Sequence, residues 1–311
     1  MLQKFIHTIC KKGVKFMLVL SLAYDGEMNF IQDIQEVRAL FKEKNIKIGV
    51  SESLEGNTHF IKVFCDEENN DKIKNIVHLY MSNILYKLVV DTYKSKALFE
   101  YLTDTFFFLK HDEILEVEDR IMKTLKGEEM IKDENSIYCC NRINNVVEKI
   151  RACMEENNNI NINGFITFRM KEIAQDIESV IDKIVEKYLV EKEYKEFIKL
   201  LKYFVDIQES KIEEINLVIE GEGSYKIRDS YGNDIYYDFL KEIGDLKVGS
   251  KVNMEDVIIS GLITNSPKRI IIHKQENCSN KEFIDTIVNV FGERVSYCDK
   301  CSVCVSSKIK I

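Results

Sequence analysis

The chain has 311 residues, which suggests two or three domains at about 100–200 residues per domain. Hydrophobic residues make up 45% and charged residues 31%, a globular composition that excludes wholesale disorder, and no apolar run approaches the roughly 20 residues of a membrane span. The 44 Lys and Arg against 52 Asp and Glu give a formal net charge of −8, which argues against a nucleic-acid binder with a broad cationic face.

The N-terminal sequence fits either a buried strand or a secretory signal. Four lysines precede the apolar run Phe16–Ala23, which ends in the small residues that a signal peptidase prefers. We favour a buried strand after a basic extension, because the run is short for a signal. The nine cysteines form an odd, clustered set, which fits a reducing cytoplasm better than a secreted disulfide scaffold. We therefore expect a cytoplasmic protein, with secretion as the alternative.

Residues 1–120 mix strand and helix patterns and are expected to form a small mixed α/β unit. After the first strand, the predicted elements are a helix over Asn29–Lys44, strands over Ile46–Ser53 and His59–Cys65, and helical structure over Asp71–Leu109. The run Phe106–Leu109 is apolar on all sides, which predicts a deeply buried segment.

Residues 121–210 are expected to be helical. A first helix is predicted over Ser136–Glu156. The stretch Phe165–Ser210 contains neither glycine nor proline, and its apolar stripe is interrupted at Glu191–Glu193. Because a helix of that length is unusual in a globular domain, we predict two helices that meet near residues 190–193.

Residues 211–311 alternate strand and helix patterns and are expected to form an α/β layer. The predicted strands are Ile215–Glu220, Ser224–Arg228, Asp234–Tyr237 and Arg269–His273, and the predicted helices are Asn253–Leu262 and Lys281–Phe291. The fold class is therefore α+β, with a small mixed α/β N-terminal unit, a helical middle and a C-terminal α/β layer.

The block Asn163–Gln208 resembles the YtxC-like family of sporulation proteins from spore-forming Firmicutes. The residues that carry the resemblance are Gly164-Phe165, Phe168-Arg169, Glu193–Phe197 and Leu200–Val205. The resemblance implies a role in endospore formation. It assigns no catalytic residues that can be carried over to this chain.

The strongest chemical signal is the spacing Cys298-x-x-Cys301-x-x-Cys304 near the C-terminus. Thiolates at this spacing can converge on one metal ion, as in zinc and iron–sulfur sites. A four-coordinate site needs one more ligand, for which we prefer Cys278, with His273 as the alternative. If the strand that ends at His273 pairs in parallel with the strand before Cys298, either residue reaches the same sheet edge. Zinc is favoured over an iron–sulfur cluster because the fourth cysteine lies far upstream.

Two other interpretations of these cysteines stay open. We prefer three reduced thiols on a C-terminal tail equally with a metal site, and we place a redox-active disulfide below both. Gly221-Glu222-Gly223 lacks the third glycine of a nucleotide loop, so we interpret it as a hairpin turn.

Two classes of function remain after these exclusions. The first is a sporulation protein that acts through contacts with an unidentified protein partner, because no catalytic triad, paired-carboxylate site or HExxH motif is present. The second is an enzyme with an unrecognised site between the helical region and the C-terminal region, lined by Arg169 or Glu193. Arg169 is expected to pair locally with Glu172 or Asp176. The stripe Phe197, Leu201 and Phe204 is expected to be core or a helix–helix seam, with a groove for a protein partner as the alternative.

Overall fold

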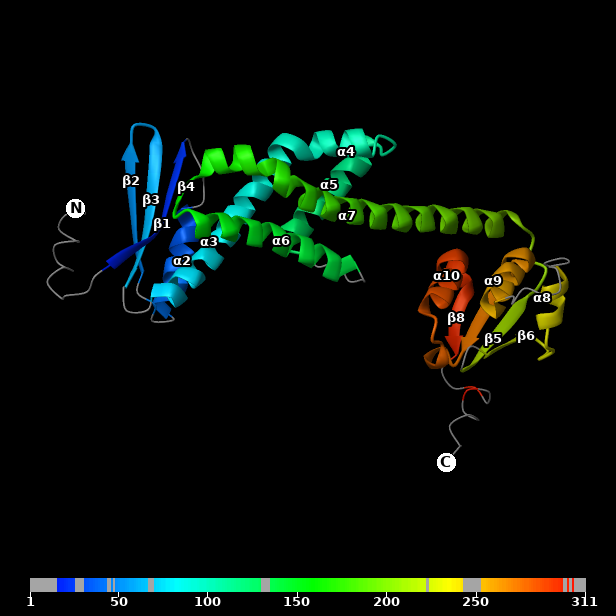
Figure 1. The fold of residues 1–311 in the computed structure, drawn as a ribbon. Helices are drawn as coiled ribbons and strands as arrows, with labels where there is room; N and C mark the ends of the chain where they lie inside the picture. Colours follow the sequence, from blue (N-terminus) through cyan, green and yellow to red (C-terminus); the bar gives the residue numbers. More distant parts are fainter. Residues whose placement is uncertain are drawn as a thin grey trace, which may run out of the picture. The chain divides into compact units, whose positions relative to one another are not determined.

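The computed structural model describes residues 16–25, 31–43, 46, 48–66, 70–129, 135–221, 224–242, 253–298, 301 and 304. The basic residues before Phe16 and the second half of the Gly221–Gly223 turn lie outside the described residues. The chain forms two compact units, residues Met1–Tyr188 and Leu189–Ile311 (Figure 1). Their boundary lies inside one long helix.

The first unit contains a four-stranded sheet in the order β2-β3-β1-β4. β1 pairs with β3 in antiparallel register and with β4 in parallel, so it is an interior strand. Its side chains at Val19, Leu20 and Leu22 are fully buried, which confirms the predicted first strand. The strands are β1 (Phe16–Asp25), β2 (Ile48–Glu55), β3 (Thr58–Asp66) and β4 (Asn159–Asn161).

Helices form most of the remaining described part of the first unit, and apolar side chains from them are buried. The Tyr86 hydroxyl donates a hydrogen bond to the Leu125 carbonyl at 2.8 Å, which ties α3 to the end of α5. Besides the first part of the long helix α7 (Ile162–Ile207), the helices are α2 (Ile31–Glu43), α3 (Asn70–Tyr93), the short π-helix η3 (Lys94–Leu98), α4 (Phe99–Thr105), α5 (His111–Leu125) and α6 (Asn135–Glu156). The predicted helix over Ser136–Glu156 is thus confirmed to within one residue.

The expected buried segment Phe106–Leu109 is a turn between α4 and α5. Phe107 is 80% exposed and Phe108 is 54% exposed, and only Leu109 is buried. The two exposed rings contact each other edge-to-face, with centroids 5.7 Å apart. The prediction of deep burial is wrong, because a continuous apolar run at the end of a helical hairpin cannot direct every side chain toward one core.

α7 (Ile162–Ile207) is one continuous helix, so the predicted break near residues 190–193 is wrong. Glu191, Lys192 and Glu193 are good helix formers, and no glycine or proline interrupts them. The interruption of the apolar stripe has another cause: the boundary between the two compact units follows Tyr188. The stripe before the boundary packs in the first unit, and Val205 packs in the core of the second.

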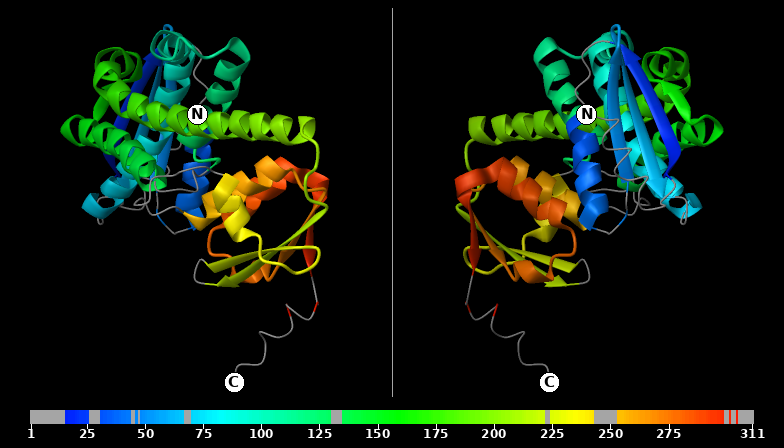
Figure 2. Two further views of the ribbon diagram at one scale, coloured as in Figure 1. Left: turned by 90° about the vertical axis from the view of Figure 1, so that its right-hand side faces the viewer. Right: turned by 90° about the vertical axis from the view of Figure 1, so that its left-hand side faces the viewer.

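The second unit contains the sheet β6-β5-β7-β8, in which β5–β6 is antiparallel and β5–β7 and β7–β8 are parallel. Helices α8, α9 and α10 cover one face of this sheet (Figure 2). Alternate strand residues, among them Ile215, Leu217, Ile270 and Ile272, point into the core beneath the helices. The elements are β5 (Glu214–Gly221), β6 (Ser224–Asp229), α8 (Tyr236–Glu242), α9 (Met254–Asn265), β7 (Arg269–His273), α10 (Lys281–Phe291) and β8 (Val295–Cys298).

One predicted strand of this unit is absent. Residues Asp234–Tyr237 contribute a single bridge between Asp234 and Arg228, and the chain then enters α8. The Asp234 carboxylate accepts a hydrogen bond from the Tyr236 backbone N–H at 3.0 Å. An aspartate that accepts a hydrogen bond from the first backbone N–H of a helix favours helix over strand, which explains the difference.

The architecture confirms the α+β class. Among the described residues, no helix combines the length and the apolar content that a membrane span requires. The sequence-based boundaries at residues 120 and 210 do not coincide with the boundary between the two compact units, which follows Tyr188. The division of the chain into three regions stays a prediction.

Candidate metal centre

The ends of two neighbouring strands bring the first two candidate ligands together. β7 and β8 are parallel, and His273 and Cys298 are directly opposite each other in their register. Both are the last residues of their strands, so their side chains lie side by side at the same sheet edge. They occupy the sheet face opposite to Ile270 and Ile272, which point into the core. The parallel pairing on which the choice of a fourth ligand depended is therefore present.

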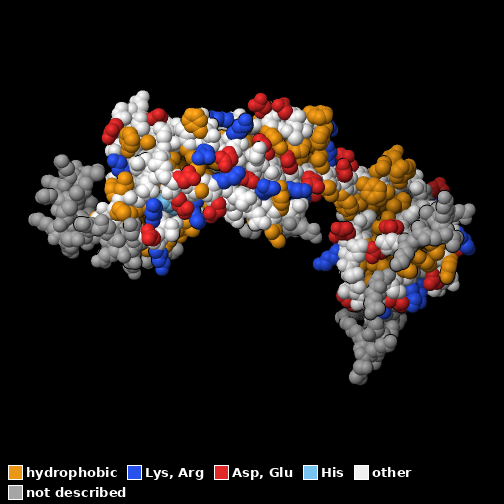
Figure 3. Space-filling view, viewed as in Figure 1, with side chains coloured by type: hydrophobic (Ala, Val, Ile, Leu, Met, Phe, Trp, Pro, Cys, Tyr) orange, Lys and Arg blue, Asp and Glu red, His pale blue; other side chains and the backbone are white. Residues whose placement is uncertain are grey.

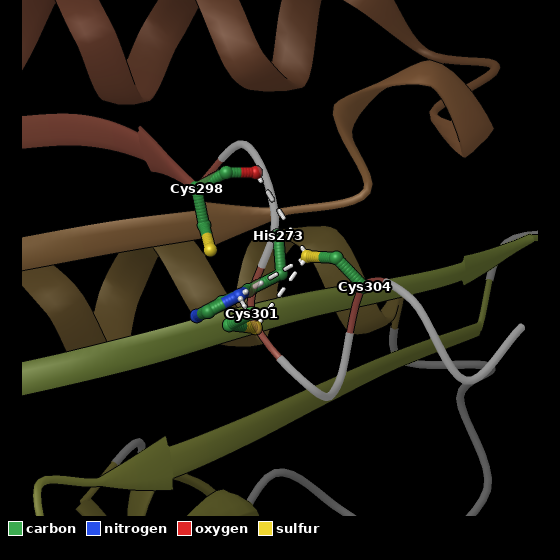
Figure 4. Close-up of side chains that lie close together, drawn as sticks. All are labelled: His273, Cys298, Cys301 and Cys304. Atoms are coloured by element: carbon green, nitrogen blue, oxygen red, sulfur yellow. Dashed lines mark hydrogen bonds between the residues drawn. The ribbon is translucent and has the colours of Figure 1, made fainter.

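The chain after β8 adds two more sulfur atoms. The Cys301 Sγ lies 3.4 Å from the His273 Nδ1, and the Cys304 Sγ lies 3.5 Å from the same nitrogen. The two sulfurs are 3.7 Å apart, and the Cys304 backbone N–H donates to the Cys301 carbonyl at 3.0 Å. Figure 4 shows the sulfur of Cys298 directed toward the same imidazole. The ligand atoms of all four residues lie within 4.8 Å of one another.

These spacings agree with a tetrahedral metal site. With bonds of about 2.3 Å to sulfur and about 2.0 Å to nitrogen, neighbouring ligand atoms of a zinc site lie roughly 3.5–3.8 Å apart. The three separations among His273, Cys301 and Cys304 run from 3.4 to 3.7 Å. His273, Cys301 and Cys304 can therefore hold one metal ion with little movement of their side chains, and the Cys298 sulfur lies within 4.8 Å of their ligand atoms.

Burial shifts the pKa values of two members of the group, His273 and Cys304. Desolvation lowers the pKa of His273 below its ordinary value, so its imidazole is neutral at neutral pH, as a metal ligand must be. Burial, together with hydrogen bonds to Cys301 and Cys298, raises the pKa of the Cys304 thiol to about 11. Without a metal this thiol keeps its proton, and metal binding displaces it.

Cys278, the preferred fourth ligand from the sequence, is not part of this group. Its sulfur donates to the Asn280 carbonyl at 3.1 Å and lies 3.9 Å from the Tyr225 hydroxyl. Tyr225 in turn donates to the Glu255 carboxylate, so Cys278 belongs to a separate polar cluster. The arrangement gives no support to Cys278 as a ligand. His273, the alternative considered with it, occupies the place beside the three cysteines.

A further residue of the site, Asn216, escaped sequence analysis. Its Oδ1 lies 3.0 Å from the Nε2 of His273, on the side of the ring away from the sulfurs. The available signal was a single amide side chain inside the apolar strand run Ile215–Ile219. Sequence alone does not connect that signal to His273, which lies 57 residues further along the chain.

Several residues of α7 lie outside the metal group and have other partners or are exposed. The Arg169 guanidinium pairs with the Glu172 carboxylate at 3.1 Å, as expected. The Tyr194 hydroxyl lies 3.1 Å from the Thr286 hydroxyl. In the stripe expected to be a helix seam, Leu201 packs against the core of the second unit, whereas Phe197 is 54% and Phe204 is 43% exposed. The seam interpretation holds for Leu201 alone.

Comparison with known proteins assigns a family to most of the chain. The model of the YtxC-like family matches residues 79–296, which is more than half of the chain and ends before Cys298. The "Uncharacterized protein YtxC" of Bacillus subtilis (strain 168) is 20% identical over 227 residues, which cover 70% of this chain and 76% of that protein. No solved structure matches.

Proposed function

The chain belongs to the YtxC-like family, and from this premise we propose that it is a sporulation-associated protein that carries structural zinc and acts through contacts with other proteins. The sporulation role rests on the family resemblance of the Asn163–Gln208 block. A cytoplasmic location is part of the proposal, and it is supported by the odd, clustered set of nine cysteines, which fits a reducing compartment.

The convergence of His273, Cys298, Cys301 and Cys304 carries the proposal. A set of three thiolates and one imidazole suits zinc, and four protein ligands close a tetrahedral site. Catalytic zinc sites keep one position for water or substrate, whereas structural sites do not. A closed site therefore favours a metal that orders the C-terminal end of the chain over one that performs chemistry.

The exposed face of α7 supports action through protein contacts. Large apolar side chains gather over the C-terminal part of this helix (Figure 3). The exposed residues are Tyr194, Phe197, Leu200, Tyr203, Phe204 and Ile207. Contiguous exposed apolar surface is a feature of protein interaction sites, and this one lies within the block that resembles the family. The partner it suits is a protein with an apolar surface of its own.

Metal content tests the zinc assignment. Protein purified without oxygen should contain about one zinc ion per chain, as a single tetrahedral site requires. Cys301→Ser and Cys304→Ser should lose the metal, because each removes one thiolate, whereas Cys278→Ser should keep it and serves as the matched control. Wild-type protein free of zinc, or metal loss in Cys278→Ser, contradicts the assignment.

Deletion of the gene in a spore-forming host tests the biological role. The deletion should lower the yield of spores, and the wild-type gene should restore it. Phe197→Ser should fail to restore the yield while keeping its zinc, because it removes an exposed aromatic ring, and Lys199→Ser on the same helix is the control. A normal yield of spores at normal timing after deletion contradicts a sporulation role.

A further inference from the structure

Asn216 lies on β5 and reaches the metal centre across the sheet. In the parallel register of β5 and β7, Asn216 is opposite Ile271, so His273 is its diagonal neighbour on the same face. This face is opposite to the one that the helices cover, because Ile215 and Leu217 on either side of Asn216 point into the core. The Asn216 amide therefore lies beside the Nε2 of the His273 imidazole, and the Cys301 and Cys304 sulfurs lie beside its Nδ1.

Hydrogen bonds fix the orientation of the Asn216 amide. Its Nδ2 donates to the Glu214 carboxylate at 3.2 Å and lies 3.5 Å from the Asp229 carbonyl oxygen. Both are acceptors, so the nitrogen must face them and the Oδ1 must face the His273 ring. The Glu214 carboxylate is held in turn by Arg269, whose guanidinium lies 3.5 Å away.

An amide oxygen only accepts hydrogen bonds, and this determines the state of the ring nitrogens. The His273 Nε2, 3.0 Å from the Asn216 Oδ1, must carry a proton to make that hydrogen bond. In a neutral imidazole the proton on Nε2 leaves a lone pair on Nδ1, the atom that lies 3.4 and 3.5 Å from the sulfurs of Cys301 and Cys304.

We infer that Asn216 is a positioning residue that holds His273 in its Nε2–H tautomer and so presents Nδ1 to the three thiols as the metal ligand. The inference deepens the proposed function and rests on it for the identity of the metal. Hydrogen-bond partners of ligating histidines typically change metal affinity by about 10–100-fold when they are removed. Asn216 is expected to act in this way without touching the metal.

The tautomer of His273 is read directly from long-range ¹H–¹⁵N spectra of the imidazole ring, with His273→Gln used to assign its signals. Metal-free wild-type protein should show the proton on Nε2, and zinc-loaded protein should show zinc on Nδ1. In Asn216→Leu the metal-free ring should populate both tautomers, because the acceptor that selects one of them is gone. A change in packing alone would not move this signal.

Measurements of zinc affinity separate the effect of the hydrogen-bond acceptor at residue 216 from the effect of the shape of its side chain. Asn216→Leu should bind zinc about 10–100-fold more weakly than the wild type. Asn216→Asp keeps an acceptor for the Nε2 proton, so it should retain the tautomer and bind closer to the wild type than the leucine variant. Ser296→Ala lies on the same face, where its hydroxyl bonds to the Ile270 carbonyl, and it should leave the affinity unchanged.

The outcomes distinguish this inference from the proposed function. Zinc bound through Nε2, or equal affinity in Asn216→Leu and the wild type, overturns the role of Asn216 and leaves the zinc site intact. A wild-type protein that binds no zinc but shows the Nε2–H tautomer overturns the zinc assignment and supports the positioning role. A metal-free ring with its proton on Nδ1 overturns the inference whether or not zinc binds.

Discussion

The clearest residue-scale interaction outside the metal centre is the buried carboxylate of Asp176 on α7. Lys149 contacts it at 2.8 Å and Arg142 at 3.1 Å, both from α6. Burial by itself raises the pKa of Asp176, but the hydrogen bonds from Lys149 and Arg142 outweigh that effect and hold the pKa below its ordinary value. The ion pairs therefore tie α6 to α7 at neutral pH.

The lowered pKa of Asp176 fixes the sign of its pH dependence. Its contribution to the free energy of unfolding is present above the unfolded-state pKa of about 4, and it is lost as the pH falls through the lower folded-state pKa. Asp176→Asn should lower the free energy of unfolding at pH 7 by about 1–3 kcal/mol, because two charged partners lose their acceptor. Denaturant unfolding at pH 7 and at pH 3 measures both effects.

The control for Asp176 lies on the same helix. Glu186 pairs with Lys183 one turn away and is exposed, so Glu186→Gln should change the free energy of unfolding by less than about 0.5 kcal/mol. If Asp176→Asn matches this control at pH 7, or if the gap between them widens toward pH 3, the stabilising role assigned to the Asp176 pairs is contradicted.

Helix α9 packs closely against α8 at Gly261. A Cβ atom placed on Gly261 would lie 2.0 Å from a ring carbon of Phe239, which is itself fully buried. Alanine is favoured over glycine in a helix by about 1 kcal/mol, yet the clash with a packed aromatic ring costs typically 1–3 kcal/mol. We therefore expect Gly261→Ala to destabilise the protein, which a thermal unfolding midpoint will show.

A double-mutant cycle with Phe239→Leu provides the control for that contact. Leucine removes the ring that the new methyl group meets. Gly261→Ala should therefore lower the thermal unfolding midpoint less in the Phe239→Leu background than in the wild type. Equal costs in the two backgrounds would show that the effect of Gly261→Ala comes from somewhere other than the contact between α8 and α9.

At the scale of the whole molecule, α7 is the element that both compact units share. Glu193 is exposed on α7 just beyond the boundary between the units. Glu193→Pro removes a backbone donor inside a continuous helix and should lower the free energy of unfolding by about 3 kcal/mol, with loss of helical circular dichroism. Glu193→Ala should be neutral. Two helices that meet at this point would accept the proline at their junction without such a loss.

The sequence by itself determined the features that depend on local pattern. Helical and alternating periodicities located β1, α6, β7 and α10, and the cysteine spacing identified the thiol cluster. The resemblance in the Asn163–Gln208 block indicated the family, which the family model over residues 79–296 confirms. These features could be predicted because each is determined within a few turns of helix or one length of strand.

Only the tertiary structure decided which distant residues meet. The parallel register of β7 and β8 places His273 beside Cys298, and the register of β5 and β7 brings Asn216 behind the imidazole. The place of Cys278 in another cluster, the exposure of Phe107 and the continuity of α7 were equally hidden in the sequence. The physical reason is that register, burial and unit boundaries follow from the packing of a sheet against its helices, whose contacts join segments far apart along the chain.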